Sequence, residues 1–181
     1  MDAIELLMHD HRVVEQLFRD YRTAASGAQQ RAVIETLVLE LAEHGALEEF
    51  MIYPLAERVL PGGEREIHAC LAEHREAKKT LLALDKLSEG DERAGPLVER
   101  LRQEIEEHVR GEEGSLLPRL RAAVSQKDLD ELGQLLQQAK QTAPTRPHPH
   151  APVEPPASAD TGTVAGAYDR LRDRLQGRPS T

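Results

Sequence analysis

The chain has 181 residues, of which 39% are hydrophobic and 30% charged, and its formal net charge is −9. This charge excludes the basic footprint that nucleic-acid binding requires, and no helix carries a basic stripe of the kind that binds membrane surfaces. With no Trp, two Phe and three Tyr, the core must consist of Leu, Val, Ile and Ala, which favours packed helices over a β-sandwich.

Four long segments with helical periodicity are separated by helix breakers. The first covers about residues 2–25 and ends near "SGAQ", and the second covers about 30–60 and ends at "PGG". The third covers about 64–87, and the fourth starts at "GP" (95 and 96) and continues to about 123. Short connections between four such segments predict an all-α protein, an antiparallel up-down-up-down four-helix bundle over residues 1–125.

The rest of the chain contains two weaker helical segments and a Pro-rich stretch. A short additional helix is predicted at 126–141, where Ser125 as N-cap and Asp128 three residues later resemble a capping box. Residues 142–163 are rich in Pro and small side chains and are predicted to be an extended linker. Within 164–181, a weak amphipathic helix either docks on the bundle, binds a partner or stays mobile, and the sequence does not decide between these.

Six polar residues lie in phase with the apolar faces of the four long segments. Their order is His, His-x-x-x-Glu, His, His-x-x-x-Glu, and the spacing from each single histidine to the next histidine is 33 and then 34 residues. The chain therefore contains two copies of one helix pair. The six residues are His11, His44, Glu48, His74, His108 and Glu112.

The spacing of four residues within each His-x-x-x-Glu motif has a chemical reason. Residues four apart on a helix are separated by roughly 40° around the axis and about 6 Å along it, so both side chains can reach one metal, or the Glu can reach a second. Burying two carboxylates without a cation costs several kcal/mol each, so we predict a metal site. Imidazole and carboxylate ligands suit iron, zinc, copper or manganese. A structural zinc would leave two ligands surplus, whereas a dinuclear centre, with iron the best choice, leaves positions open for an exogenous ligand.

This pattern resembles the hemerythrin-like family with HHE cation-binding motifs, over about residues 1–125. The resemblance implies a non-haem di-iron centre, with an oxo or hydroxo bridge, Glu48 and Glu112 as bridging carboxylates and the four histidines as terminal ligands. The tail, with "PTRPHPHAP" and "DRLRDRL", is similar to extensions of actinobacterial members. The oxygen-carrying hemerythrins have a second histidine one turn after the third-helix histidine, where this chain has Lys78. This difference argues against simple reversible O₂ carriage.

Two further residues are candidates for a role at the centre. Tyr53 lies nine residues after His44 and would point to the opposite side of an ideal helix, about 180° away. However, Pro54 removes an amide and crowds the preceding turn, so a bulge could direct Tyr53 inward as a ligand or a neighbour of the ligands. The alternative is a partly exposed packing residue. Glu15, one turn after His11, is either an acceptor or extra ligand at the centre or a solvated side chain.

The remaining polar and reactive residues are assigned simpler roles. Lys78 is expected to pair with Glu15, and Glu49 to face solvent. Cys70, the only cysteine, is expected to be a buried apolar side chain and cannot form an intramolecular disulfide. His9 and His68 lie off the apolar faces and are expected at the surface. His148 and His150 lie in the Pro-rich tail, where a solvated linker is favoured over the alternative of stray metal binding.

These observations leave three functions open. The first is a di-iron oxidoreductase that reacts with hydrogen peroxide, reactive nitrogen species or both, with Tyr53 or Glu15 adjusting the centre or handling protons. The second is a protein that binds O₂ or NO, or senses redox state or iron, without turnover. The third, a structural zinc bundle, is disfavoured by the surplus of ligands. The expected partner is a small molecule, the oligomeric state stays open with a monomer included, and the N-terminus and hydropathy predict a soluble cytoplasmic protein.

Overall fold

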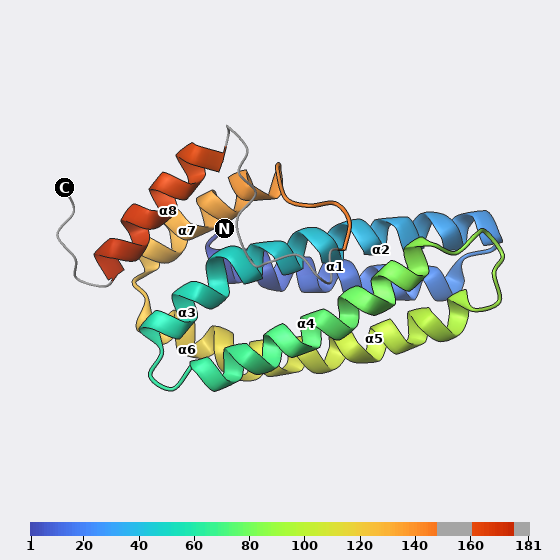
Figure 1. Cartoon of the computed structure of the whole chain (residues 1–181), viewed down its shortest axis with the longest axis horizontal. Coiled ribbons are helices and arrows are strands. Elements are labelled where there is room, and N and C mark those ends of the chain that lie inside the picture. Colours follow the sequence, from blue (N-terminus) through green and yellow to red (C-terminus); the bar gives the residue numbers. More distant parts are fainter. Residues whose placement is uncertain (148–160, 176–181) are drawn as a thin grey trace.

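The computed structural model describes residues 1–147 and 161–175, and the regular secondary structure in these ranges is entirely helical. The predicted all-α class is therefore confirmed. Four long helices lie side by side (Figure 1), and each contacts its neighbours along the chain and across the group. These helices are α1 (Ala3–Thr23), α2 (Gly27–Leu47), α4 (Glu64–Asp85) and α5 (Ala94–Gly111).

Both α2 and α5 continue through a π-helical turn into a short α-helix. α2 is followed by η1 (Glu48–Ile52) and α3 (Tyr53–Val59), and α5 by η2 (Glu112–Leu116) and α6 (Leu117–Ala123). A proline is the second residue after each π turn, Pro54 in one repeat and Pro118 in the other. Since proline has no N–H and its ring crowds the carbonyl four residues earlier, the wider turn accommodates it. The bulge that we expected before Pro54 is present, and it occurs in both repeats.

Side-chain caps explain where several of these helices begin. Asp2 and Glu5 form a reciprocal capping box at the start of α1, and Arg121 of α6 donates to the same Asp2 carboxylate. α2 starts at Gly27, earlier than predicted, because Ser26 accepts a hydrogen bond from the backbone N–H of Gln29.

Two apolar clusters fill the interior, and the polar residues singled out above lie between them. Along α1, Leu7 belongs to one cluster and Val14 to the other, with His11 between them. Along α2, Leu41 and Leu47 flank His44 in the same way. The buried polar site is therefore enclosed at both ends by apolar side chains, which exclude water and strengthen electrostatic interactions between its groups.

Helices α7 (Gln126–Lys140) and α8 (Thr161–Leu175) pack together at one end of the four long helices (Figure 1). Ser125 accepts from the backbone N–H of Asp128 and thereby caps α7. Gly133 of α7 lies against the N-terminal backbone, where a Cβ would come within 2.7 Å of the Met1 carbonyl oxygen. Most of the predicted linker, residues 148–160, lies outside the described residues.

The docked α8 contacts the first π turn directly. Tyr168 is 8% exposed, and its hydroxyl donates a 2.6 Å hydrogen bond to the backbone carbonyl of Met51 in η1. Leu171, one turn later, is buried in the apolar cluster that contains Leu7 and Leu47. Of the possibilities that the sequence left open for this segment, the structure shows docking on the rest of the chain. Among the described helices, none is long and apolar enough to cross a membrane.

Candidate metal centre

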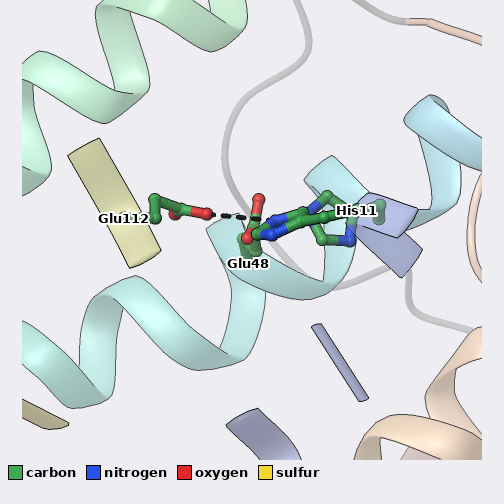
Figure 2. Close-up of side chains that lie close together, drawn as sticks. His11, Glu48 and Glu112 are labelled. Carbon is green, nitrogen blue, oxygen red and sulfur yellow. Dashed lines mark ion pairs between the residues drawn. The ribbon is translucent and has the colours of Figure 1, made fainter. Parts of the chain in front are cut away.

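The structure brings the six predicted histidines and glutamates together from four different helical runs, and each of them is at most 7% exposed. His44 Nε2 lies 3.1 Å from Glu48 Oε1, and His11 Nε2 lies 3.4 Å from Glu112 Oε2. Figure 2 shows His11, Glu48 and Glu112 pointing toward one another. The potential ligand atoms of His11, His44, Glu48 and Glu112 all lie within 4.8 Å of one another.

Each glutamate reaches both pairs of histidines. The two oxygens of Glu48 lie 3.1 Å from His44 Nε2 and 3.2 Å from His74 Nε2. Glu112 Oε2 lies 3.4 Å from His11 Nε2 and 3.5 Å from His108 Nε2. The site therefore has two halves, one with His11 and His44 and the other with His74 and His108, and both carboxylates lie between the halves.

The half with His11 and His44 contains buried polar atoms that no protein group satisfies. Among the described residues, five atoms of this half have no hydrogen-bond partner: His11 Nε2, His44 Nδ1 and Nε2, Glu48 Oε1 and Glu112 Oε2. An unsatisfied buried polar group typically costs about 1–3 kcal/mol, and more when it is charged. Two imidazole nitrogens and two carboxylate oxygens at these separations are a suitable donor set for a divalent transition metal. The residues present therefore fit a metal ion.

Tyr53 points into the other half of the site. Its side chain is 1% exposed, and its hydroxyl donates to Glu112 at 2.8 Å and lies 3.1 Å from His74 Nε2. The π turn explains this direction, because it absorbs one residue and rotates Tyr53 by roughly 100° relative to an ideal helix. Leu117, the matching residue of the second repeat, is buried in the apolar cluster, so the two halves differ in this position.

A carboxylate lies behind each histidine, on the Nδ1 side of the ring. Three of these contacts are hydrogen bonds, from His11 to Glu113 at 2.9 Å, from His74 to Glu49 at 2.9 Å and from His108 to Glu73 at 2.8 Å. The fourth, between His44 and Asp10, is a 3.6 Å ion pair, and Lys140 of α7 holds Asp10. Histidines that bind metals usually donate their second ring N–H to a carboxylate or carbonyl, which fixes the ring and leaves Nε2 free to bind.

These outer carboxylates were missed in the sequence, although a signal for them was present. Glu49 and Glu113 each follow the motif glutamate, and Asp10 and Glu73 each precede a motif histidine, so they repeat with the motifs. The expectation that Glu49 faces solvent is wrong, since it is 6% exposed. It accepts from His74 and from Lys78 Nζ at 2.6 Å, because η1 turns it toward α4.

The expectation that Glu15 acts at the centre is not supported by its position. Its side chain is 55% exposed and forms an ion pair with Arg19 on the same helix. Glu113, and not Glu15, lies at hydrogen-bond distance from the Nδ1 atom of His11. Lys78 pairs with Glu49 and not with Glu15.

Ionisation in the metal-free site follows from burial and from the two glutamates. Burial alone would lower the pKa of His44, but the charge of Glu48 and the contact with Asp10 outweigh it and raise the pKa to about 10. Burial would raise the pKa of Glu48, but His44 and the neighbouring histidines lower it well below its usual value. Burial and the charges of Glu48 and Glu112 raise the pKa of Tyr53 well above 10, so its hydroxyl keeps its proton.

The other cysteine and histidine candidates occupy simpler positions. Cys70 is buried in an apolar cluster, and its thiol lies within 4.8 Å of ligand atoms of His108 and Glu112. Burial and the charge of Glu112 raise the pKa of this thiol to about 12. His9 and His68 are exposed. His148 and His150 lie outside the described residues.

A small cavity of about 30 Å³ borders the histidine side of the site. All four motif histidines line it, and Gly45 and Lys78 lie at its wall. The remaining lining residues are apolar, and they are Val14, Leu41, Ala77, Leu81, Ile105 and Val109. Since one water molecule needs roughly 10–15 Å³ of this kind of space, the cavity has room for a molecule with two heavy atoms.

The helical fold and the two buried sets of histidine and glutamate side chains define a class of protein. It is a metal-binding helical domain with an internal repeat. The model of the hemerythrin HHE cation binding domain matches residues 2–120 and, in a second match, residues 66–177. The chain therefore belongs to the hemerythrin HHE cation-binding domain family, as the motifs indicated.

Two similar proteins agree with this assignment. An uncharacterized hemerythrin-like protein of Schizosaccharomyces pombe is 25% identical over 176 residues, which are 97% of this chain and 87% of the yeast protein. The crystal structure of a hemerythrin HHE cation binding domain-containing protein from Mycobacterium kansasii superposes with a TM-score of 0.66. That likeness covers 78% of this chain and 89% of the other at 22% identity, so it supports the shared fold.

Proposed function

We propose that this protein is a non-haem di-iron oxidoreductase that consumes hydrogen peroxide, reactive nitrogen species or both in a catalase-like or peroxidase-like reaction. The observation that carries the proposal is the small cavity, which is lined by all four motif histidines. A small oxidant that enters it meets these histidines and Lys78 within an otherwise apolar wall.

In this proposal the six motif residues hold two iron ions. His11 and His44 would hold one ion, His74 and His108 the other, and Glu48 and Glu112 would each be shared between the two. The distances from each carboxylate to histidines of both halves support this division. When bound, two iron ions supply a Lewis-acidic centre that can exchange two electrons with a substrate.

The surrounding residues orient the ligands and control protons. Tyr53 lies on the carboxylate side, where its hydroxyl holds a proton and donates to Glu112 at 2.8 Å. Deprotonated Tyr53 would be an additional oxygen ligand for the half with His74 and His108. Lys78 lies at the cavity wall and forms an ion pair with Glu49. Apolar residues on both sides of the site exclude bulk water.

A second candidate function is the binding of O₂ or NO, or the sensing of redox state or iron, without turnover. The size and apolar lining of the cavity favour it, since a diatomic gas fits the same space. Against simple O₂ carriage stands Lys78, which occupies the position of the fifth imidazole in the oxygen-carrying members and is held by Glu49. For either function, we also propose that the four long helices run in the predicted antiparallel, up-down-up-down order.

One experiment separates these functions. The protein is loaded with iron, its metal content and visible spectrum are recorded, and O₂ release is followed after hydrogen peroxide is added. We expect about two irons per chain, as the ligand count requires, and sustained O₂ release. A spectrum that changes reversibly with O₂ or NO, without consumption of peroxide, would favour the second function, and zinc occupancy without a redox response would refute both. The Glu48→Ala variant is expected to lose both metal and activity.

A further inference from the structure

A second and larger cavity lies on the outer surface of the site, in the groove between α1 and α5. Its volume is about 260 Å³, and its lining includes His11 and Glu113, which are hydrogen-bonded to each other. We call it the α1–α5 groove. It shares four lining residues with the small cavity at the histidines, namely His11, Val14, Ile105 and Val109. The two cavities are therefore neighbours, separated by these side chains.

The charge of the groove is opposite to that of the protein as a whole. Five arginines and three glutamates line it, which leaves a surplus of two positive charges in a chain whose net charge is −9. The arginines come from one face of α1 and the facing side of α5, and they are Arg12, Arg19, Arg22, Arg102 and Arg110. A concave surface lined by one sign of charge concentrates ions of the other sign.

Within the described part of the chain, two of these arginines form no ion pair. Arg12 is paired with Glu113, Arg19 with Glu15, and Arg102 with Glu106 and Glu99. Arg22 lies close enough to Glu99 for its charge to lower the pKa of that carboxyl. Neither Arg22 nor Arg110 forms an ion pair within the ranges that the structure describes. Their guanidinium groups therefore keep donors available, and guanidinium forms paired hydrogen bonds to oxyanions more readily than an ammonium group does.

We propose that the α1–α5 groove is an anion-binding vestibule of the metal centre, which collects a small oxyanion beside His11. Arg22 and Arg110 supply the unpaired positive charge, and the groove leads the anion to the wall formed by Val14, Ile105 and Val109. For the proposed function, the groove also defines a class of substrate. It delivers negatively charged, oxygen-containing oxidants preferentially to the metal centre, which neutral peroxide reaches as well. Only this second statement rests on the proposed function.

The binding step is tested on the metal-free, full-length protein with nitrite as the probe. Arginine side-chain N–H signals and the His11 ring are followed by NMR while nitrite is added at constant ionic strength, with chloride as the reference anion. We expect saturable shifts for Arg22, Arg110 and His11 with nitrite. In the double variant Arg22→Gln/Arg110→Gln, the affinity for nitrite should fall by about tenfold or more. Shifts that are equal with chloride, or that the double variant retains, would overturn the proposal.

A matched control separates local charge from total charge. The double variant Arg65→Gln/Arg75→Gln removes the same two charges from exposed positions of α4, outside the groove. It should bind nitrite as the unchanged protein does. If it loses binding to the same extent, the effect belongs to the net charge of the protein and the vestibule is refuted.

The delivery step is tested on the iron-loaded protein with superoxide, an anion, and hydrogen peroxide, which is neutral. The groove double variant should slow the reaction with superoxide several-fold at low salt, with the difference lost at high salt, and should leave the rate with peroxide unchanged. Equal slowing of both oxidants would contradict selective delivery. If neither oxidant reacts while nitrite still binds to the metal-free protein, the proposed function fails and the vestibule stands.

Discussion

At the scale of single residues, the orientation of the histidine rings depends on the carboxylates behind them. Glu49 and Glu113 occupy the same position in the two repeats, and each accepts a hydrogen bond from Nδ1 of a histidine on the other helix pair. Each also holds a cation, Lys78 in one repeat and Arg12 in the other. These contacts fix the tautomer that leaves Nε2 facing the centre of the site.

This arrangement predicts that Glu49→Gln weakens metal binding without removing a ligand. The amide keeps the shape of the side chain but loses the charge that makes the His74 ring a better donor, so we expect a loss of affinity of about 10- to 100-fold. Competition with a chelator measures the affinity. Glu113→Gln should behave alike, and Glu15→Gln, on the exposed face of α1, should have no effect. Unchanged affinity in Glu49→Gln would show that the outer carboxylates do not act on the metal.

A second prediction at this scale concerns Asp2 and acid stability. Burial would raise the pKa of Asp2, but hydrogen bonds from Arg121, Gln126 and the backbone of Glu5 lower it from 3.8 to about 2. A carboxyl with a lowered folded-state pKa stabilises the protein above its unfolded pKa, and this stabilisation is lost as the pH falls from 3.8 toward 2. In metal-free protein, Asp2→Asn should therefore lower the free energy of unfolding by up to about 2 kcal/mol at pH 7.

The difference between Asp2→Asn and the unchanged protein should shrink below pH 4, because the native carboxyl then becomes neutral as well. Urea unfolding at several pH values measures this difference, and comparing the two proteins at each pH cancels the contributions of other titrating groups. A difference that stays constant from pH 7 to pH 3 would show that the charge of Asp2 is not the stabilising feature.

The sequence was sufficient to find the six motif residues, because polar residues at helical spacing on apolar faces stand out and repeat. It also indicated Tyr53, since Pro54 made a bulge predictable. Glu49 was assigned to the wrong environment, and for Glu15 the pattern left a role at the centre and a solvated side chain open. A helical pattern shows which residues share a face, but it does not show which neighbouring helix covers a residue at the edge of that face. That depends on how α2 and α4 are placed in three dimensions.

At the scale of elements, the π turn η1 aligns three side chains of the first repeat. His44 and Glu48 are four residues apart, and Tyr53 follows after five, which the π turn makes equivalent to one further turn. The bounds of the long helices could be predicted from periodicity and breakers. The docking of α8 could not, because it depends on contacts between residues more than 100 positions apart, such as Tyr168 and Met51.

The contact between α8 and η1 predicts a local effect of Tyr168→Phe. Removing the hydroxyl removes the hydrogen bond to the Met51 carbonyl and should cost about 1 kcal/mol of stability. Amide exchange within η1 should become faster, because the π turn loses an external support. Arg174→Gln removes an exposed ion pair with Asp128 and Glu131 and serves as the control, with a cost of about 0.5 kcal/mol or less. Unchanged exchange in η1 of Tyr168→Phe would show that α8 does not support this turn.

At the scale of the whole molecule, the chain contains a repeated helix pair, and the two halves of the buried site have different neighbouring residues. Two helix pairs of the same pattern contribute equal sets of histidine and glutamate side chains to the buried site. Tyr53 faces the half with His74 and His108, and its counterpart Leu117 is apolar. On the other side, the α1–α5 groove reaches His11. The duplication explains the six motif residues, and the departures from it give each half a different neighbour.

The central claim is that these six residues hold two iron ions, and a crystal structure of the iron-loaded protein tests it most directly. Anomalous difference maps recorded on both sides of the iron absorption edge locate iron without reference to activity. We predict two peaks, one beside His11 and His44 and one beside His74 and His108, with Glu48 and Glu112 reaching both. A single peak, or peaks that do not depend on the iron edge, would contradict the di-iron assignment.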